Sequence, residues 1–397
     1  DGSGIKIGVI SDSYDILGGE AAGIANALLE ESELVVYVDD LTGNAHLVQA
    51  VTETFAYGFL LSRRHHATDV AVADVAAARV HEQARRGLRV PVGIAADDDV
   101  ATVLVDESQR IERFFERGGL DANGDLTGLH VRISGQSILA SVNPNWMQNG
   151  VDMFVFQGLL PDGDHAISYS IPNLLVDHAM RNPPVPPGFW RGVNVNQNAV
   201  YMECFMDELA HAAGADPLAF RRKLMADHPK SLAVLNAVAE KAGWGTPAPE
   251  GVHRGLAVCK AFASHVAACA EVSVSKTGKL RIHRIVAATD PGYAVNPQQI
   301  EAQVEGSFVF GLSALLYGEC TIREGGVEQT NFSNYPTMLI DEMPEVEVII
   351  MPSGGFWGGI GEPTIAVAAP AVLNAIFAAT GKRIRRIPLK HSDLTPV

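Results

Sequence analysis

Residues 354–363 are Gly-Gly-Phe-Trp-Gly-Gly-Ile-Gly-Glu-Pro, with five glycines among the first eight positions. Because glycine lacks a Cβ atom, the backbone of such a loop can approach a ligand closely. Glu362 ends the loop, and we expect the rings of Phe356 and Trp357 to shield its carboxylate partly from water. That shielding would raise the pKa of Glu362 towards neutrality and suit it to act as a general base. A glycine-rich turn with a glutamate at a helix N-terminus, where the helix dipole favours it, explains the same residues.

Two further stretches carry residues suited to holding a ligand. Arg191 follows a proline-rich segment, residues 182–188, whose prolines exclude helix and central strand and indicate a rigid loop. A planar guanidinium held by that loop could bind an anionic ligand, or it could pack on Trp190 at the surface. Gln303 and Gly306 offer an amide and a backbone N–H to a heterocycle, although the polar start of a helix also accounts for them.

Composition limits the class of protein. The chain has 397 residues, enough for about two to three domains. Of these residues 47% are hydrophobic, which indicates a globular protein with a large core. The formal net charge of −16 argues against nucleic acid as the main partner, because phosphate contacts need clustered lysine and arginine. The most apolar segment, 365–380, contains Pro370 and Asn374, so we expect no membrane span in this chain.

The cysteines and histidines do not form a metal-binding pattern. None of the four cysteines belongs to a C-x-x-C pair, and neither iron–sulfur nor zinc spacing occurs. The adjacent residues His65 and His66 would project in different directions in regular structure, so we expect no metal held by protein side chains. If the chain carries redox chemistry, its electrons must leave through another chain.

The expected elements divide the chain near residue 125. We expect strands at 5–10 and 33–38, helices at 20–30 and 68–86, and a charge-rich linker or helix-loop at 106–125. Beyond them we expect strands at 129–134, 271–275, 279–287 and 346–351, and helices at 199–213, from 217, at 231–242 and at 370–380. Asp216 and Ser231 are the expected N-caps of two helices, and Lys276-Thr277-Gly278 indicates a hairpin turn. The sequence thus predicts two domains, 1–125 and 126–397.

Several motifs in a fixed order resemble one family. They are Gly-Phe-Trp-Arg-Gly at 188–192, Tyr-Met-Glu-Cys-Phe-Met-Asp-Glu-Leu-Ala at 201–210 with Asp-Pro-Leu at 216–218, Gln-Val-Glu-Gly at 303–306 and Gly-Glu-Pro at 361–363. The stretches 131–138 and 373–384 add to the match. Residues 125–397 therefore resemble the molybdopterin-binding subunit of the xanthine oxidase family of molybdenum hydroxylases. The branch is that of the isoquinoline 1-oxidoreductase large (beta) chain and the membrane-associated bacterial aldehyde dehydrogenases.

The resemblance implies an α+β fold, with a molybdenum-cofactor-binding domain of the xanthine oxidase type preceded by a smaller α/β segment. It implies that Glu362 is the catalytic base and that the cofactor is molybdopterin with molybdenum, in the cytosine dinucleotide form of bacterial enzymes. The implied cofactor-binding residues are Arg191, Gly192, Gln303, Gly306, Gly359 and Gly361, and the implied substrate-pocket residues are Trp190, Phe356 and Trp357. In that family pterin sulfurs hold the metal, which agrees with the lack of a His/Cys ligand cluster in the sequence.

The same resemblance implies a reaction and partners. The substrate would be an aldehyde or an N-heterocycle, oxidised with water as the oxygen source. Electrons would pass to iron–sulfur clusters on a partner subunit, and a cytochrome c subunit is a further candidate partner. Related subunits occur both in the bacterial cytoplasm and in membrane-associated complexes of the periplasm, so the compartment stays open.

Two alternatives stand beside this interpretation. The Gly-Gly-x-Phe-Gly and Gly-Gln-Gly loops that the family carries upstream are not found in residues 1–125, as expected of a non-catalytic or remnant subunit that scaffolds a partner. Residues 4–13 resemble the first strand of subtilisin-like serine proteases, with Asp12 and His66 at triad positions. No Gly-Thr-Ser nucleophile motif follows, so a hydrolase is the weakest of the three hypotheses.

Overall fold

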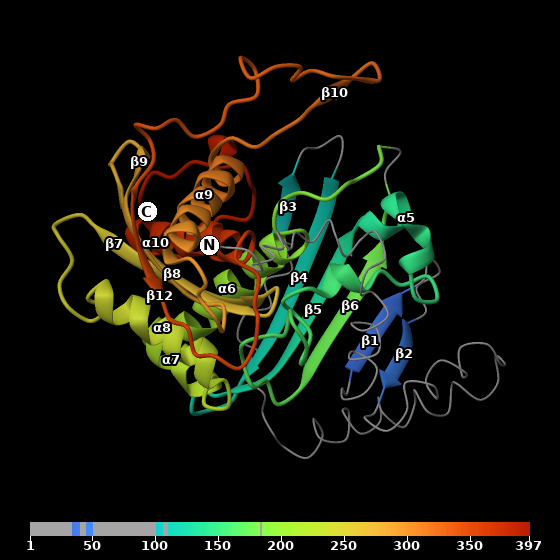
Figure 1. Cartoon of the computed structure of the whole chain (residues 1–397), viewed down its shortest axis with the longest axis horizontal. Coiled ribbons are helices and arrows are strands. Elements are labelled where there is room, and N and C mark those ends of the chain that lie inside the picture. The colour runs from blue at the N-terminus through green and yellow to red at the C-terminus, as the bar shows by residue number, and fades with distance from the viewer. Residues whose placement is uncertain (1–33, 40–44, 51–100, 106–109, 183–184) are drawn as a thin grey trace, which may run out of the picture.

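The computed structural model describes residues 34–39, 45–50, 101–105, 110–182 and 185–397, with side chains from residue 116 onward. A six-stranded sheet has the strand order β2-β1-β6-β5-β4-β3 (Figure 1). Its strands are β1 (Leu34–Asp39), β2 (Ala45–Ala50), β3 (Ala101–Val105), β4 (Arg110–Leu120), β5 (Leu126–Gly135) and β6 (Leu174–Met180). β6 pairs in parallel with β1 and with β5, and the other neighbours are antiparallel.

The first part of the chain contributes strands to this sheet. The strand expected at 33–38 is confirmed as β1, and that at 129–134 lies within β5. The linker or helix-loop expected at 106–125 is wrong, because β4 pairs with β5 along most of its length, and this pairing outweighs the charge-rich composition. The sheet thus takes strands from both sides of residue 125, and the division into two domains stays a prediction. The elements expected at 5–10, 20–30 and 68–86 lie outside the described residues.

A four-stranded sheet follows, in the order β12-β9-β8-β7. Its strands are β7 (His253–Ala261), β8 (Ser264–Val274), β9 (Leu280–Asp290) and β12 (Glu345–Ile350). β7, β8 and β9 are antiparallel, and β12 pairs in parallel with β9. The hairpin expected around 276–278 is confirmed, and Gly278 adopts the positive φ of 78° that its turn requires.

The helices pack mainly around this second sheet. They are α5 (Ile138–Val142), α6 (Val195–Ala212), α7 (Pro217–Leu224), α8 (Pro229–Lys241), α9 (Pro297–Leu316) and α10 (Ala368–Thr380), with short 3-10 turns η1 (Pro144–Trp146), η2 (Met153–Phe156), η3 (Pro363–Val367) and η4 (Leu389–His391). Both α8 and α10 pack against β8, where the consecutive residues 266–270 are all fully buried, so both faces of that strand are covered. α6 contacts β4 of the first sheet and β7 of the second, and it therefore joins the two sheets.

The N-cap of α7 lies where the sequence predicts it, whereas the N-cap of α8 does not. Asp216 caps α7 by accepting hydrogen bonds from the N–H groups of Leu218 and Ala219, as expected. The N-cap expected at Ser231 is wrong, because α8 begins two residues earlier at Pro229, with His228 at the cap position. Proline at the first helical position is preorganised for a helix start, and the Ser231 hydroxyl bonds instead to His265.

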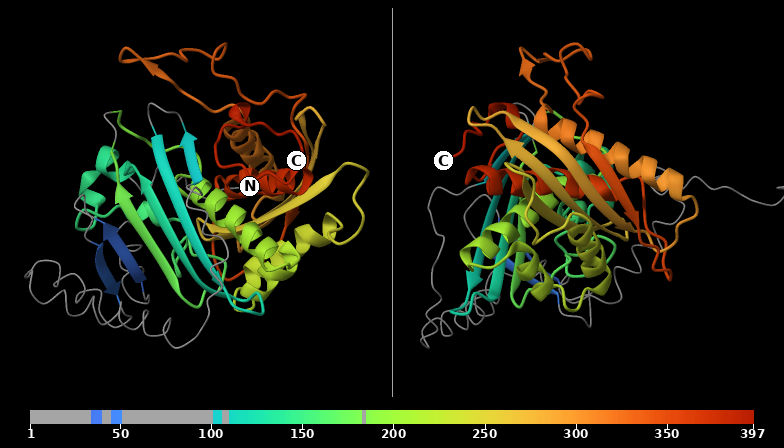
Figure 2. Two further views of the ribbon diagram at one scale, coloured as in Figure 1. Left: turned by 180° about the vertical axis from the view of Figure 1, so that it is seen from behind. Right: turned by 90° about the vertical axis from the view of Figure 1, so that its left-hand side faces the viewer.

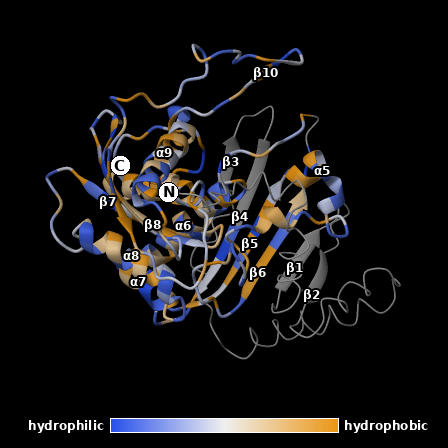
Figure 3. Ribbon diagram, in the orientation of Figure 1, coloured by the Kyte–Doolittle hydropathy of each residue, from blue (hydrophilic) through white to orange (hydrophobic). Residues whose placement is uncertain are grey.

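One apolar stretch, Pro363–Thr380, is long and apolar enough to cross a membrane when length and composition alone are considered among the described residues. It comprises η3 and α10, is mostly buried and lies against β7 and β8. Hydrophobic residues gather on this stretch and on the strands that it covers (Figure 3). A Cβ atom at Gly255 of β7 would lie 2.2 Å from the backbone nitrogen of Ala375, so α10 packs directly on the strand backbone.

A buried ionic network fixes α6 in this core. Arg221 of α7 is fully buried, and its Nε donates to Glu203 Oε2 at 3.1 Å. Glu203 also accepts hydrogen bonds from the Tyr169 hydroxyl and from the backbone N–H of Val258. Although burial alone lowers the pKa of Arg221, the negative charge of Glu203 outweighs it and holds the pKa above its ordinary value. Burial raises the pKa of Glu203, and the Arg221 charge and the hydrogen bonds from Tyr169 and Val258 oppose that shift.

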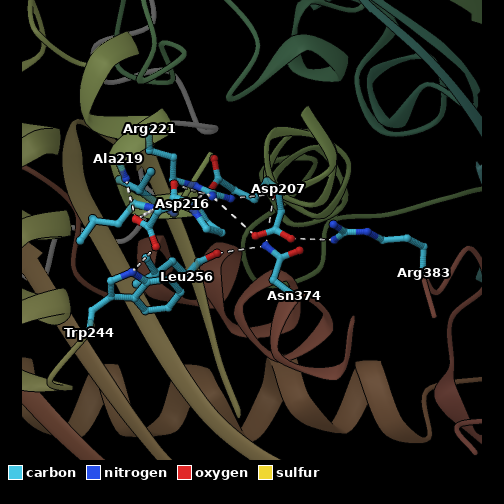
Figure 4. A network of polar contacts seen from close by, with 12 residues as sticks. Asp207, Asp216, Ala219, Arg221, Trp244, Leu256, Asn374 and Arg383 are labelled. Atoms are coloured by element: carbon cyan, nitrogen blue, oxygen red, sulfur yellow. Dashed lines mark hydrogen bonds and ion pairs between the residues drawn. The ribbon is translucent and has the colours of Figure 1, made fainter. Parts of the chain in front are cut away.

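The network extends to α10 and the C-terminal segment (Figure 4). Asn374 Nδ2 donates to the carbonyl oxygens of Glu203 and Leu256, which ties α10 to α6 and β7. Arg383 donates to Asp207 of α6 at 2.8 Å and stacks on Phe377. These contacts explain the acidic positions of the 201–210 motif as structural anchors of α6.

The segment 318–344 extends away from the two sheets in both views of Figure 2. It contains the short hairpin β10 (Ile322–Arg323) and β11 (Gly326–Val327). Phe332, Leu339 and Ile340 are strongly exposed on it. Its base is held by hydrogen bonds such as that from the backbone N–H of Met338 to the Ser313 hydroxyl of α9.

Candidate functional site

Arg191 joins three segments that lie far apart in the sequence. Its Nε donates to the carbonyl oxygen of Gly361 at 2.6 Å. Its Nη2 donates to the backbone carbonyl of Gln303 at 3.0 Å and to the Gln303 side-chain Oε1 at 3.1 Å. The structure therefore brings together three residues that the sequence singled out separately, and the arginine fork is the element that connects them.

Glu362 lies beside this arginine. It is half-buried at the N-cap position of η3, and its Oε1 accepts a hydrogen bond from the backbone N–H of Gly192 at 2.8 Å. A backbone donor of this kind stabilises the ionised form of a carboxylate. Burial lowers the pKa of Arg191 from its ordinary value, and the negative charge of Glu362 opposes that shift. The raised pKa expected for Glu362 itself stays a prediction.

The backbone turn that presents the Gly192 N–H is unusual. Gly192 has φ +86°, and a Cβ atom there would lie 2.1 Å from Asn196 Oδ1 and 2.6 Å from Ile365 Cγ2, so only glycine fits. Val193 follows with φ +48°, which a β-branched residue rarely adopts. Asn196 holds the turn by donating from Nδ2 to the Arg191 carbonyl at 2.7 Å. Backbone strain of this kind gathers where a precise geometry is needed.

A set of amides behind the turn was not predicted from the sequence. Gln157 Oε1 accepts from the backbone N–H of Asn194 at 3.1 Å, and Asn198 Nδ2 donates to the carbonyls of Val155 and Gln157. These groups anchor the start of α6 against the segment around η2. The run Asn-Val-Asn-Gln-Asn at 194–198 is unusually rich in amides and was the available signal.

Part of the glycine-rich loop is explained by packing within the protein. A Cβ atom at Gly358 would lie 2.2 Å from Ser264 Oγ, and one at Gly359 would lie 2.9 Å from Phe262 Cβ. Gly359 is also clamped by hydrogen bonds, its N–H donating to Phe262 and its carbonyl accepting from the Ser264 hydroxyl. Close approach to the β7–β8 turn therefore requires these two glycines, whatever else they contact.

The aromatic residues divide into separate groups. Trp190 packs on Phe310 of α9 at 6.1 Å between ring centroids, and the Arg191 guanidinium lies 5.3 Å from the same ring. Trp357 instead packs on Tyr293 at 4.6 Å and stays strongly exposed. Phe356 lies against His265 and the Lys230 ammonium. Of the three aromatic residues assigned to the substrate pocket, Trp190 is the one that packs on the same ring as Arg191.

The donors around Arg191 fit a pterin-type cofactor bound by hydrogen bonds. Because the carboxamide oxygen of exposed Gln303 faces Arg191, its NH2 group faces away and can donate to a ligand. The nearest atoms to a Cβ at Gly306 and at Gly361 are 3.6 Å and 3.8 Å away, so neither position is crowded. The backbone N–H expected to be available at Gly306 is wrong, because Gly306 lies inside α9, where the N–H groups bond within the helix. Among the described residues no group of three or more His, Cys, Asp or Glu side chains could hold a metal ion.

Other candidates from the sequence take no part in this constellation. Asp12, His65 and His66 lie outside the described residues. None of the four cysteines forms a disulfide, and Cys259 and Cys269 are buried. Burial raises the pKa of the Cys269 thiol to about 12, which makes it unreactive near neutral pH.

Comparison with known proteins finds a molybdopterin cofactor-binding domain over residues 206–344. Membrane-bound aldehyde dehydrogenase [pyrroloquinoline-quinone] of Gluconacetobacter polyoxogenes is 29% identical, covering 70% of this chain and 39% of the relative. The beta chain of isoquinoline 1-oxidoreductase of Brevundimonas diminuta is 28% identical, covering 56% of this chain and 29% of the relative. The B component of nicotinate dehydrogenase of Pseudomonas putida is 29% identical, covering 68% of this chain and 24% of the relative. The chain thus spans a quarter to two fifths of the length of these relatives.

Solved structures share the fold. Quinoline 2-oxidoreductase from Pseudomonas putida 86 superposes with a TM-score of 0.56 at 12% identity, covering 71% of this chain and 61% of that one. Aldehyde oxidoreductase from Desulfovibrio gigas gives a TM-score of 0.53 at 15% identity, covering 70% of this chain and 48% of that one. The α+β architecture expected from the sequence is confirmed.

Proposed function

We propose that this chain is a molybdopterin-binding subunit of the xanthine oxidase family and that it carries the general base of a molybdenum-dependent oxidoreductase. The single observation that supports the base is the half-buried Glu362 carboxylate, oriented by the Gly192 N–H at 2.8 Å. An ionised carboxylate can accept at both oxygens, and the Gly192 N–H orients one of them. We assign proton removal from the attacking oxygen to Glu362.

Molybdopterin with its molybdenum would supply the redox chemistry when bound, and the residues of this chain would position it. The Gln303 amide, held by Arg191, would donate to the pterin. The backbone of Gly306 and Gly361 would lie along the same ligand, and Gly192 and Gly359 would fix the two loops that frame it. We further propose that the bound cofactor is the cytosine dinucleotide form of molybdopterin.

The substrate is proposed to be an aldehyde or an N-heterocycle. Trp190 and Phe310 form an aromatic wall beside Arg191, which suits a flat substrate, and Phe356 and Trp357 are kept as further candidates. Electrons are proposed to leave through iron–sulfur clusters on a partner subunit, with a cytochrome c subunit as a further candidate acceptor. Named relatives that act on aldehydes, isoquinoline and nicotinate support this range of substrates.

The test compares Glu362→Gln with Glu301→Gln, an exposed glutamate of α9, in the natively purified complex. Glutamine keeps the size and the acceptor oxygen of Glu362 but cannot take up the proton. We expect Glu362→Gln to lower turnover about 100-fold or more, with molybdenum content and the unfolding midpoint unchanged. A Glu362→Gln enzyme as fast as Glu301→Gln would contradict the assignment.

A further inference from the structure

The turn that carries Arg191 and Gly192 is closed by a hydrogen bond between its first and last residues. The backbone N–H of Val193 donates to the Trp190 carbonyl at 2.8 Å, and Gly192, the third residue, has φ +86°. A positive φ at the third residue is typical of a type II turn. Type I and type II turns differ mainly by a rotation of the central peptide, which here joins Arg191 to Gly192. The orientation of this peptide therefore decides where its carbonyl and its N–H point.

Both ends of that peptide are held by side chains. In a trans peptide the C=O and the N–H point in opposite directions. The Arg191 carbonyl accepts from Asn196 Nδ2 at 2.7 Å. The Gly192 N–H donates to Glu362 Oε1 at 2.8 Å. Rotation of the peptide towards the type I orientation would break both bonds and would turn the Arg191 carbonyl towards the Glu362 carboxylate.

The bond to Glu362 depends on the charge of that residue. A backbone N–H bonds more strongly to an ionised carboxylate than to a neutral acceptor. The Glu362 bond therefore favours this peptide orientation while the group is ionised, and it weakens once the group takes up a proton. The bond from Asn196 to the Arg191 carbonyl joins two neutral groups and does not depend on that charge. Asn196 is thus the contact that holds the turn in both protonation states of Glu362.

The same contact leaves the oxygen of the Asn196 amide unpaired. The NH2 group must face the Arg191 carbonyl, because a carbonyl can only accept a hydrogen bond. Oδ1 is therefore directed at Gly192, where a Cβ atom would lie 2.1 Å from it. This oxygen is buried and has no hydrogen-bond partner among the described residues. Buried polar atoms without a partner are rare and destabilise a fold, so the arrangement at Asn196 points to a role other than stability.

We infer that Asn196 is a positioning residue for Glu362, because it locks the Arg191–Gly192 peptide in the orientation that directs the Gly192 N–H at the carboxylate. The inference rests on the proposed function in so far as Glu362 is the general base. The Arg191 guanidinium is a charged group that faces Glu362. Its own hydrogen bonds go to α9 and to the glycine-rich loop, so a change at Asn196 alters the donor to Glu362 and leaves this charge in place.

The test follows the ionisation of Glu362 directly, by NMR of the whole chain carrying 13C at the glutamate side-chain carboxyls. The signal of Glu362 is identified by its loss in Glu362→Gln. We expect Asn196→Ala to shift the titration midpoint of this carboxyl upward by about one pH unit, because an ionised carboxylate is destabilised when it loses its N–H donor. Alanine is the better helix former and removes the unpaired oxygen, so the melting temperature should stay close to that of wild type.

Gln298→Ala is the matched control. Gln298 is the second residue of α9, as Asn196 is of α6, but its side chain is exposed. In this control Glu362 should titrate as in wild type. Asn196→Ser, whose hydroxyl ends one bond short of the amide nitrogen, is a second variant and should give the same upward shift as Asn196→Ala. A Glu362 midpoint that stays at the wild-type value in both Asn196 variants, or an equal shift in Gln298→Ala, would overturn the inference.

The pH dependence of turnover separates this inference from the proposed function. In the natively purified complex, we expect the acid limb of kcat/KM for Asn196→Ala to move upward together with the carboxyl titration. If Glu362→Gln turned over as fast as wild type, the proposed function would fail, but the NMR titration would still decide the role of Asn196. If turnover of Asn196→Ala fell equally at every pH while Glu362 titrated as in wild type, Asn196 would be merely structural and the inference would be overturned.

Discussion

Gly192 is the residue whose replacement most directly probes the geometry of the site. It combines φ +86° with a contact that leaves no room for a Cβ atom. We predict that Gly192→Ala lowers the free energy of unfolding by about 1–3 kcal/mol, through backbone strain and overpacking. Urea unfolding monitored by tryptophan fluorescence measures the change.

Gly188 provides the matched control for that substitution. It lies in the same loop but is exposed, and a Cβ atom there would contact nothing within 4 Å. We expect Gly188→Ala to change stability by less than about 0.5 kcal/mol. Equal effects at both positions would show that the tight turn around Gly192 is not the cause of the lost stability.

Single residues also show where sequence reasoning reached its limit. The sequence singled out Arg191, Gln303 and Glu362 as candidates, but their spacing along the chain could not show that they lie close together. Arg191 and Gly361 are separated by 170 positions, and only folding brings them within 2.6 Å. Asn196 was missed because an asparagine near a helix start usually indicates only a cap.

Among the elements, α6 matters most for the site, because Arg191 and Gly192 lie just before its first turn. The buried pair of Arg221 and Glu203 anchors this helix to α7 and β7. We predict that Arg221→Met costs about 3–5 kcal/mol, because it leaves the Glu203 carboxylate buried without its cation. Chemical denaturation of the variant gives the measurement.

An exposed ion pair supplies the comparison. Arg323 and Glu328 pair on the hairpin of β10 and β11, with Arg323 three-quarters exposed. Glu328→Gln should leave the denaturation midpoint almost unchanged, because water screens the pair. If Arg221→Met were as mild as Glu328→Gln, the anchoring role of the buried network would have to be abandoned.

Elements with strong local signals could be predicted, and those set by distant pairing could not. α10 ends where expected because Gly381 takes φ +74° after its last turn, and the β8–β9 hairpin carries glycine at its turn. β4 was taken for a linker because its charges resemble an exposed segment, whereas its strand state depends on pairing with β5. At α8, proline at the first helical position outweighed the serine that follows.

At the scale of the whole molecule, acid sensitivity should come partly from Asp177 in the middle of β6. Although burial raises its pKa, hydrogen bonds from His130 and Arg132 outweigh this and hold it below its usual value. A carboxyl with a lowered pKa stabilises the fold above its unfolded pKa of about 3.9. That stabilisation is lost as the pH falls through the lower, folded-state pKa.

We therefore predict that Asp177→Asn destabilises the protein at pH 7. The difference in free energy of unfolding between wild type and variant should become smaller below about pH 4. Urea midpoints measured from pH 7 down to pH 3 follow this difference. Asp341→Asn, at an exposed position in the segment 318–344, should show no such trend. If the difference in stability stays constant with pH, the variant is destabilised by altered packing and not by the lost charge of Asp177.

We propose that this chain forms part of a molybdenum enzyme. The most direct measurement is metal analysis by inductively coupled plasma mass spectrometry on the natively purified protein, with its co-purifying chains retained. We expect molybdenum in an amount equimolar with the chain, with iron in excess from an iron–sulfur partner. A well-folded preparation without molybdenum would contradict it, and would leave a shared fold without the shared chemistry.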